Sequence, residues 1–393
     1  MKKNLIVLFI IALCLIPISV YLVFKNNKFE NLTVDQKVER KLKEMTINEK
    51  IAQMLIVYYT SDTVDENLIN TLNKNAFGGF ILMKDNITSF EKTRKFVSDL
   101  EENSDIPLII SIDQEGGDVQ RLEYLTDVKV TDVPSMYYLG KTDDEKLSYQ
   151  VGKLLAEELK TIGVNVDFAP VIDIYSNPNN KVIGKRSFGN DYNLVSKMAN
   201  SLANGLEDNG VIAVYKHFPG HGDTETDSHI DLPVINKTKE ELYELELKPF
   251  ESAIKNGAKM IMIGHIALPN ITNDNTPASL SKVLITDILK NEMGYDGLVI
   301  TDALNMGAIT NYYSYEEMYT KAVDAGADLL LMPEGSKDAI NYIKKNITED
   351  RIDESVRKIL KFKYTYLDNS FLDKEYLGSK EHLDIISNIN TEE

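Results

Sequence analysis

Short apolar runs rich in β-forming residues recur along the chain. Eight are present, at residues 51–59, 78–83, 107–113, 164–173, 211–217, 258–265, 297–302 and 327–334. Near-continuous apolar character is typical of strands that are buried on both faces of a parallel sheet. The pattern therefore predicts eight buried strands.

Amphipathic stretches with helical spacing separate most of these runs, for example at 146–163, 248–257 and 315–326, and each of the three ends in glycine, as a helix C-terminus does. Eight strands that alternate with helices predict an α/β fold, a (β/α)8 TIM-type barrel, at residues 33–366. An open doubly wound sheet is the alternative, but no G-x-G-x-x-G follows the first run and no G-x-x-x-x-G-K-[ST] occurs in the sequence.

The two ends of the chain depart from this alternation. Residues 1–32 hold twenty uncharged, mostly apolar residues at 5–24, enough to span a bilayer. The segment ends without a small-x-small cleavage site and Leu13 disfavours lipidation of Cys14, so we predict an uncleaved membrane anchor rather than a cleaved signal peptide. Lys2 and Lys3 are expected to stay cytoplasmic, which makes the barrel extracellular, or secreted if the segment is cleaved.

Residues 33–55 predict a charged surface helix that leads into the first strand, and the polar residues 367–393 predict a C-terminal tail that is no second domain.

Composition narrows the possible partners. The 43 Lys and Arg residues face 61 Asp and Glu residues, a net charge of −18, so the surface should repel nucleic acid. Cys14 is the only cysteine, which leaves the barrel without residues for disulfides, thiolate catalysis or zinc–thiolate sites. We expect no cofactor.

Polar residues gather where the predicted strands end. Asp113, Asp173, His217, His265 and Asp302 each end or closely follow an apolar run. Barrel enzymes place their active sites at this face, although a single such residue can equally be a helix N-cap. Five strand ends together favour an active site.

Asp302 follows five uncharged residues and is a candidate nucleophile for glycosyl transfer. Such a reaction also needs a proton donor and acceptor, which the loop KHFPGHGDTETDSHIDLP at 216–233 offers. There Asp227 can orient His229, and a histidine held by a carboxylate can both donate and accept a proton near neutral pH.

Metal binding is the rival interpretation of this loop, through His217, His221, His229 and Asp223. Barrel amidohydrolases use histidines after strands five and six, which His217 and His265 would match. They also need H-x-H after strand one, which is absent here. We therefore predict no metal.

Four blocks of the sequence resemble glycoside hydrolase family 3, in its β-N-acetylglucosaminidase branch. They are IDQEGGDVQRL (112–122), DFAPVIDIYSNPNNKVIGKRSFG (167–189), the loop at 216–233 and GLVITDALNMGAI (297–309), in the family's order. The resemblance covers about residues 40–365 and implies a barrel that acts on carbohydrate.

The resemblance also implies roles for individual residues. Asp302 would be the nucleophile, and His229 the acid/base with Asp227 as its partner. The sugar at the non-reducing end would be bound by Asp113, Arg121, Arg186, Lys216 and His217. Where some relatives can draw the acid/base carboxylate from a second domain, we expect this chain to supply it from the barrel.

Two positions depart from the family's pattern. Asp118 stands where arginine is common, which adds an acid near the presumed sugar site. Lys181 stands where proline is common and touches no implied role.

We predict a membrane-anchored, metal-independent, retaining exo-β-N-acetylglucosaminidase whose substrate is a GlcNAc-containing glycan, such as a peptidoglycan fragment. A histidine acid/base does not repel an anion, so phosphorolysis is a variant of this hypothesis. A β-glucosidase, a metal-dependent barrel hydrolase and a non-catalytic glycan-binding protein are the alternatives.

Overall fold

The computed structural model describes residues 32–228 and 230–392, with only the backbone of residues 73–75. The chain divides into two compact units, Met1–Met45 and Thr46–Glu393. The described part of the first unit holds α2 (Val34–Glu44), whose N-terminus is closed by a capping box between Thr33 and Gln36. All other described elements belong to the second unit.

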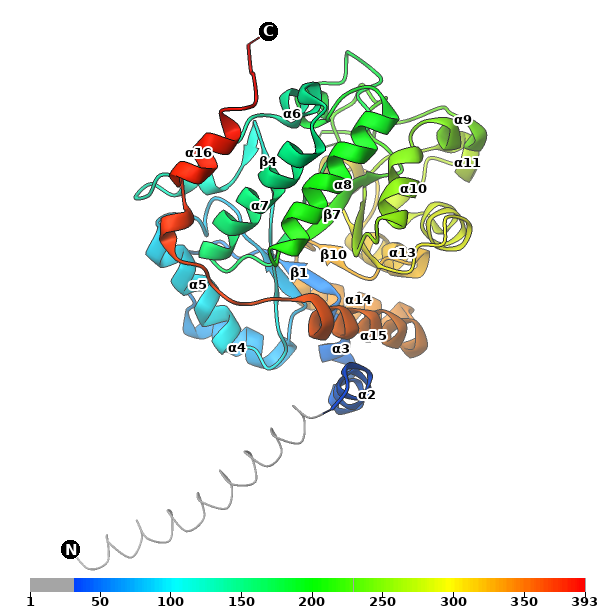
Figure 1. The fold of residues 1–393 in the computed structure, drawn as a ribbon. Coiled ribbons are helices and arrows are strands. Elements are labelled where there is room, and N and C mark those ends of the chain that lie inside the picture. The colour runs from blue at the N-terminus through cyan, green and yellow to red at the C-terminus, as the bar shows by residue number, and fades with distance from the viewer. Residues whose placement is uncertain (1–31, 229, 393) are drawn as a thin grey trace, which may run out of the picture. The chain divides into compact units, whose positions relative to one another are not determined.

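Eight strands form the main sheet of the second unit, and all of their pairings are parallel (Figure 1). In hydrogen-bonded order they are β10 (Leu330–Leu331), β1 (Leu55–Val57), β2 (Gly79–Ile81), β3 (Ile109–Ile112), β6 (Val166–Asp167), β7 (Ile212–Phe218), β8 (Met260–Ile263) and β9 (Leu298–Thr301). A parallel bridge between Ile300 and Leu329 returns β9 towards β10, so the sheet is a nearly closed barrel. Every strand overlaps a predicted run, which confirms the predicted barrel.

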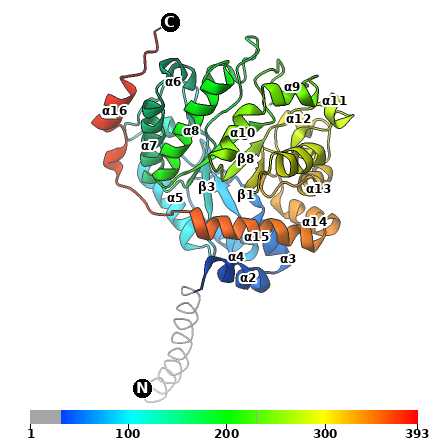
Figure 2. The ribbon, with the colours of Figure 1, turned by 45° about the vertical axis from the view of Figure 1, so that its right-hand side comes forward.

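Helices form an outer layer around these strands (Figure 2). The α-helices are α3 (Ile47–Gln53), α4 (Glu66–Asn75), α5 (Phe90–Glu102), α6 (Met136–Thr142), α7 (Glu145–Thr161), α8 (Tyr192–Asp208), α9 (Lys239–Glu244), α10 (Lys248–Lys255), α11 (Pro269–Thr272), α12 (Gly307–Thr310), α13 (Tyr315–Ala325), α14 (Ser336–Asn346), α15 (Glu349–Tyr366) and α16 (Lys380–Ile386). A π-helix, η4 (Val283–Glu292), lies between β8 and β9. The 3-10 helices are η1 (Leu122–Tyr124), η2 (Gly184–Arg186), η3 (Ala278–Leu280) and η5 (Lys374–Tyr376).

The three amphipathic stretches form α7, α10 and α13, as predicted. Gly326 ends α13 with a φ of 116°, a left-handed conformation that glycine adopts without strain. A hairpin of β4 (Gln114–Gly116) and β5 (Val119–Gln120) directly follows β3 and carries residues of the candidate site.

The prediction of a single helix over residues 33–55 is wrong in the number of helices. The chain forms two helices there, because Met45 is extended and Thr46 caps α3 in a second capping box with Glu49. Apolar spacing runs through both helices, and the N-cap signal at Thr46 decides where the second one begins.

The C-terminal residues pack against α5 and α7 and are ordered. Arg94 lies 4.8 Å over the Phe371 ring and donates to the Leu372 carbonyl at 2.6 Å. Further on, the buried His382 places its ring nitrogens 3.1 Å from Glu158 and 2.9 Å from Glu157 of α7. The tail therefore forms part of the compact unit that contains the barrel.

The predicted membrane anchor at 5–24 lies outside the described residues. Within the part of the chain that the structure describes, no helix combines the length and the apolar character needed to cross a bilayer.

Substitution of His382 by alanine is expected to lower the free energy of unfolding by about 1–3 kcal/mol, because Glu157 and Glu158 lose a buried partner. Although burial disfavours its charged form, Glu158 and Glu157 raise the pKa of His382 in the folded protein. The contribution of His382 to the free energy of unfolding is therefore complete below the ordinary histidine pKa of about 6.5. It is lost as pH rises through the raised pKa that His382 has in the folded protein. Urea unfolding of both proteins should give a difference that shrinks as pH rises above about 6.5, and a constant difference would contradict this account.

Candidate active site

A cavity of about 310 Å³ lies at the carboxyl ends of β2, β3, β7, β8, β9 and β10. Its lining includes six of the predicted site residues: Asp113, Arg121, Arg186, Lys216, His217 and Asp302. Asp227 does not line it, although the neighbouring Ser228 does, and His229 lies outside the described residues. The exposed Asp118 and Lys181 do not line it either.

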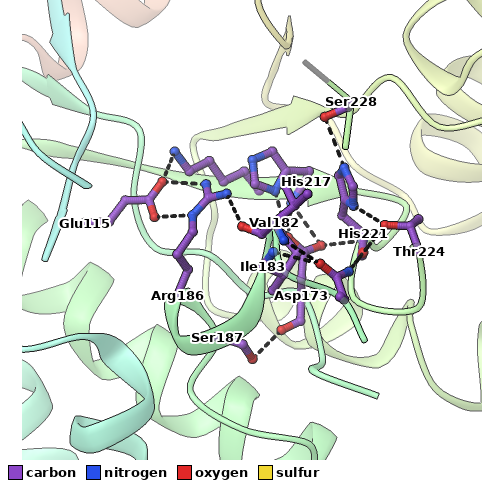
Figure 3. Close-up of polar contacts among 12 residues, drawn as sticks. Glu115, Asp173, Val182, Ile183, Arg186, Ser187, His217, His221, Thr224 and Ser228 are labelled. Atoms are coloured by element: carbon purple, nitrogen blue, oxygen red, sulfur yellow. Dashed lines mark hydrogen bonds and ion pairs between the residues drawn. The ribbon is translucent and has the colours of Figure 1, made fainter. Parts of the chain in front are cut away.

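A buried charge cluster forms one wall of this cavity (Figure 3). Lys216 of β7 is only 2% exposed, and its Nζ lies 2.7 Å from Asp113 Oδ1 and 2.5 Å from Glu115 Oε1. Arg186 of η2 donates from Nε and Nη2 to the two oxygens of Glu115 at 2.7 and 2.8 Å. Two cations and two carboxylates thus compensate one another, as buried charges must.

Mutual attraction keeps these groups charged. Burial alone would raise the pKa of Glu115, but Arg186 and Lys216 hold it well below its usual range. Burial alone would lower the pKa of Lys216, but Asp113 and Glu115 raise it above the ordinary value. The cavity wall therefore presents an ammonium, a guanidinium and the partly exposed carboxylate of Asp113.

Asp173 organises the two histidines at the end of β7 (Figure 3). Its Oδ2 accepts from His217 Nδ1 at 2.7 Å, and its Oδ1 accepts from the His221 backbone N–H at 2.6 Å. Burial opposes ionisation of Asp173, yet the two histidines lower its pKa below the ordinary value. This carboxylate fixes the orientation of the His217 ring, which lines the cavity. The hydrogen bond uses Nδ1, so Nε2 is the ring nitrogen that Asp173 does not contact.

Asp302 follows β9 at the opposite side of the cavity from β3 in the strand order. Its backbone N–H donates to the Ile263 carbonyl at 2.9 Å, and its Oδ1 accepts from the Ala303 N–H at 2.7 Å. Burial would raise its pKa, but His217 and His265 lower it below the ordinary value. Asp302 is therefore a positioned, ionised carboxylate.

His265 lies beside the cavity rather than in its lining. Its Nε2 donates to the Ala303 carbonyl at 3.0 Å, because a carbonyl can only accept, and its Nδ1 lies 2.7 Å from Ser279 Oγ. His265 thus holds the segment that carries Asp302.

The loop at 216–233 is anchored at both of its ends. His221 is buried between Thr224 and Ser228, whose hydroxyls lie 2.7 and 3.2 Å from its ring nitrogens, and burial followed by His217 lowers its pKa to about 4. His221 is thus a neutral structural residue.

Residues just after Asp302 hold the far end of the loop. The Ala308 N–H donates to the Ser228 carbonyl at 3.1 Å, Asn311 Nδ2 donates to the Ile230 carbonyl at 3.0 Å, and the Tyr312 hydroxyl contacts Asp231. These contacts flank residue 229 on both sides, so the segment that carries Asp302 sets the position of the loop.

Metal binding finds no support in the described geometry. Among residues 32–228 and 230–392, no group of three or more His, Cys, Asp or Glu side chains is arranged to hold an ion. His217 and His221 instead have Asp173, Thr224 and Ser228 as partners.

Sequence reasoning missed Glu115, which is central to the charge cluster, and gave Asp173 no role. Glu115 stands in the DQEGG stretch at 113–117, next to the predicted Asp113. The signal was a carboxylate two positions after Asp113, because alternate side chains of an extended segment share a face.

Comparison with known proteins shows which family has this fold. Residues 46–362 match the glycosyl hydrolase family 3 N-terminal domain. The chain belongs to glycosyl hydrolase family 3.

Individual family 3 proteins support this assignment. The chain is 33% identical over 287 residues to β-hexosaminidase A of Pseudoalteromonas piscicida, which covers 69% of this chain and 48% of that protein. It superposes on a family 3 β-N-acetylglucosaminidase of Paenibacillus sp. with a TM-score of 0.81 and 34% identity, over 88% of this chain and 68% of that one. A β-glucoside phosphorylase superposes with a TM-score of 0.82 and 26% identity, over 91% of this chain and 67% of that one. The chain thus spans about half the length of the Pseudoalteromonas glycoside hydrolase.

Substitution of Glu115 by glutamine is expected to lower the free energy of unfolding by about 3–5 kcal/mol, because Arg186 would lose its carboxylate partner and the buried Lys216 would lose one of its two. Asp118→Asn, in the same hairpin but exposed, is the matched control and should change it by less than about 0.5 kcal/mol. Denaturant unfolding measures both, and equal effects would show that the cluster is not needed for stability.

Proposed function

We propose that this glycoside hydrolase is a retaining exo-β-N-acetylglucosaminidase. The observation that carries the proposal is the ionised, positioned Asp302 in a cavity whose opposite wall offers both hydrogen-bond donors and acceptors. Relatives named β-hexosaminidase and β-N-acetylglucosaminidase support the choice of sugar.

Asp302 would attack the anomeric carbon and form a glycosyl-enzyme, which water then hydrolyses. A nucleophilic carboxylate must be ionised, and the lowered pKa of Asp302 meets this requirement. The Ala303 N–H that binds Oδ1 leaves the second oxygen to react.

The charge cluster would hold the terminal sugar. Asp113 can accept from sugar hydroxyls while Lys216, Arg186 and Arg121 donate. Arg121 Nε is buried and has no hydrogen-bond partner among the described residues, so a sugar oxygen would satisfy it. The cavity of about 310 Å³ is small among ligand pockets, which favours one sugar and hence exo action.

Proton transfer would fall to His229 with Asp227. Ser228 reaches the cavity lining, and the contacts from Ala308 and Asn311 hold the backbone on either side of His229. A histidine at this place can protonate the leaving oxygen and later deprotonate water. The predicted anchor, with the barrel outside the cell, would make cell-wall fragments the accessible substrate.

Replacement of Asp302 by alanine should lower kcat for a chromogenic β-N-acetylglucosaminide by about a thousand-fold or more, because the attacking group is removed. Asp296→Ala, at the other end of the same strand, is exposed and should retain activity. A chelator should leave the wild type active. An inert wild type, or an active Asp302→Ala, would overturn the proposal.

The effect of removing His229 on kcat/KM should depend on the leaving group of the substrate. With a disaccharide, His229→Ala should lower kcat/KM by about 10²–10⁴-fold, since the departing alkoxide needs a proton. With a dinitrophenyl glycoside the first step needs none, so kcat/KM should fall much less. Equal losses on both substrates would refute the acid role.

Phosphorolysis is the second candidate, favoured by the likeness to a β-glucoside phosphorylase. An imidazole acid/base would not repel a phosphate acceptor as a carboxylate would. Analysis of the wild-type products with and without phosphate distinguishes a sugar phosphate from free sugar.

A further inference from the structure

Asp167 is a buried acid at the end of β6, and no step of the proposed reaction uses it. Its exposed fraction is 0%, and its backbone pairs with Ile112 of β3 on one side and with Ala213 of β7 on the other. Asp167 does not line the catalytic cavity, whereas Asp113, the residue directly after β3, does. Any effect of Asp167 on a ligand must therefore pass through its neighbours.

A hydrogen bond from Gln114 connects Asp167 to three residues of the site. The Oδ1 atom of Asp167 accepts from the Gln114 N–H at 2.9 Å, and Gln114 lies between Asp113 and Glu115 in the sequence. The side chain of Gln114 reaches across the hairpin, where its Oε1 accepts from the Arg121 N–H at 2.7 Å. The hydrogen bond to Asp167 thus fixes the backbone from which these three side chains project.

The second carboxyl oxygen of Asp167, Oδ2, is buried and has no hydrogen-bond partner among the described residues. A buried carboxylate oxygen without a donor is strongly disfavoured, whereas a neutral acid has no charge to compensate. The charged groups that act on it are Lys216 of β7 and, after β3, Asp113 and Glu115.

Burial raises the pKa of Asp167 well above its ordinary value, the two carboxylates add to this increase, and the opposing effects of the Gln114 N–H and of Lys216 are smaller. Asp167 is therefore a neutral carboxylic acid, and Oδ2 carries its proton because Oδ1 accepts the hydrogen bond.

The charge cluster is balanced only while Asp167 is neutral. The cations Lys216 and Arg186 are compensated by two carboxylates, those of Asp113 and Glu115. An ionised Asp167 would add a third carboxylate to two cations. It would repel the other two and compete with them for the Lys216 ammonium.

We propose that Asp167 is a positioning residue, which holds the Gln114 backbone as a neutral acid and weakens sugar binding at alkaline pH when it loses its proton. This proposal rests on the proposed function, since it takes the charge cluster to be part of the sugar site. It assigns the alkaline limit of sugar binding to a group that does not touch the sugar.

Infrared spectroscopy detects the proton of Asp167 without any turnover. Full-length wild type with isotope-labelled aspartate should show the band of a protonated carboxyl group at about pH 7, where exposed aspartates are ionised. Asp167→Asn should lack this band. A wild type without the band has an ionised Asp167, which would overturn the proposal even if no variant folds.

The affinity for N-acetylglucosamine, measured by calorimetry across pH on full-length protein, tests the positioning role. Asp167→Asn keeps an oxygen for the Gln114 N–H and cannot ionise. It should bind within about 3-fold of wild type at neutral pH and keep its affinity at alkaline pH, where the wild type should weaken about 10-fold. Asp167→Ala lacks the acceptor and should bind about 5- to 10-fold more weakly at neutral pH. Asp118→Asn, exposed in the same hairpin, is the matched control and should follow the wild type.

Three results of this titration would overturn the proposal. They are a wild-type affinity that does not fall at alkaline pH, an equal fall in wild type and Asp167→Asn, and an Asp167→Ala protein that binds like the wild type. A wild type that binds N-acetylglucosamine with the expected pH dependence but hydrolyses no chromogenic substrate would overturn only the proposed function.

Discussion

The compensation of the buried Lys216 ammonium by Asp113 and Glu115 is the constraint on which the site depends. An uncompensated ammonium at 2% exposure would be strongly destabilising, so the barrel must bring β3 and β7 together with their polar ends in register. Arg186 donates two hydrogen bonds to Glu115. These bonds hold the 180–186 segment against the same wall of the cavity. The packing that closes the barrel thus also assembles this wall of the cavity.

The carboxylate of Asp173 forms a second network, which is also held together by hydrogen bonds and charge. Asp173 holds the His217 ring and the His221 backbone, and the two histidines lower the pKa of Asp173. His217 in turn helps to keep Asp302 ionised across the cavity. Each ionised acid of the cavity therefore has a cationic or hydrogen-bonding neighbour that keeps it so.

The loop around residue 229 is tied to both halves of the site. Its beginning is held by Asp173 through His221, and its end by Ala308 and Asn311, which follow Asp302 in sequence. The segment that carries Asp302 is therefore linked by hydrogen bonds to the described residues on either side of position 229.

The sequence by itself determined the eight strands and the alternating helices, because apolar periodicity is a local property of each segment. It also placed Asp113, His217 and Asp302 at strand ends, which a parallel barrel gathers at one face. The break between α2 and α3 was also local, but it depended on one N-cap rather than on periodicity. Only the tertiary structure decided the pairing of Glu115 with Arg186, 71 residues away, and of Lys216 with Asp113, 103 residues away. Such pairs form because closure of the barrel buries Lys216 and Glu115, whose charges then need partners that are distant in sequence, and no local pattern records this condition.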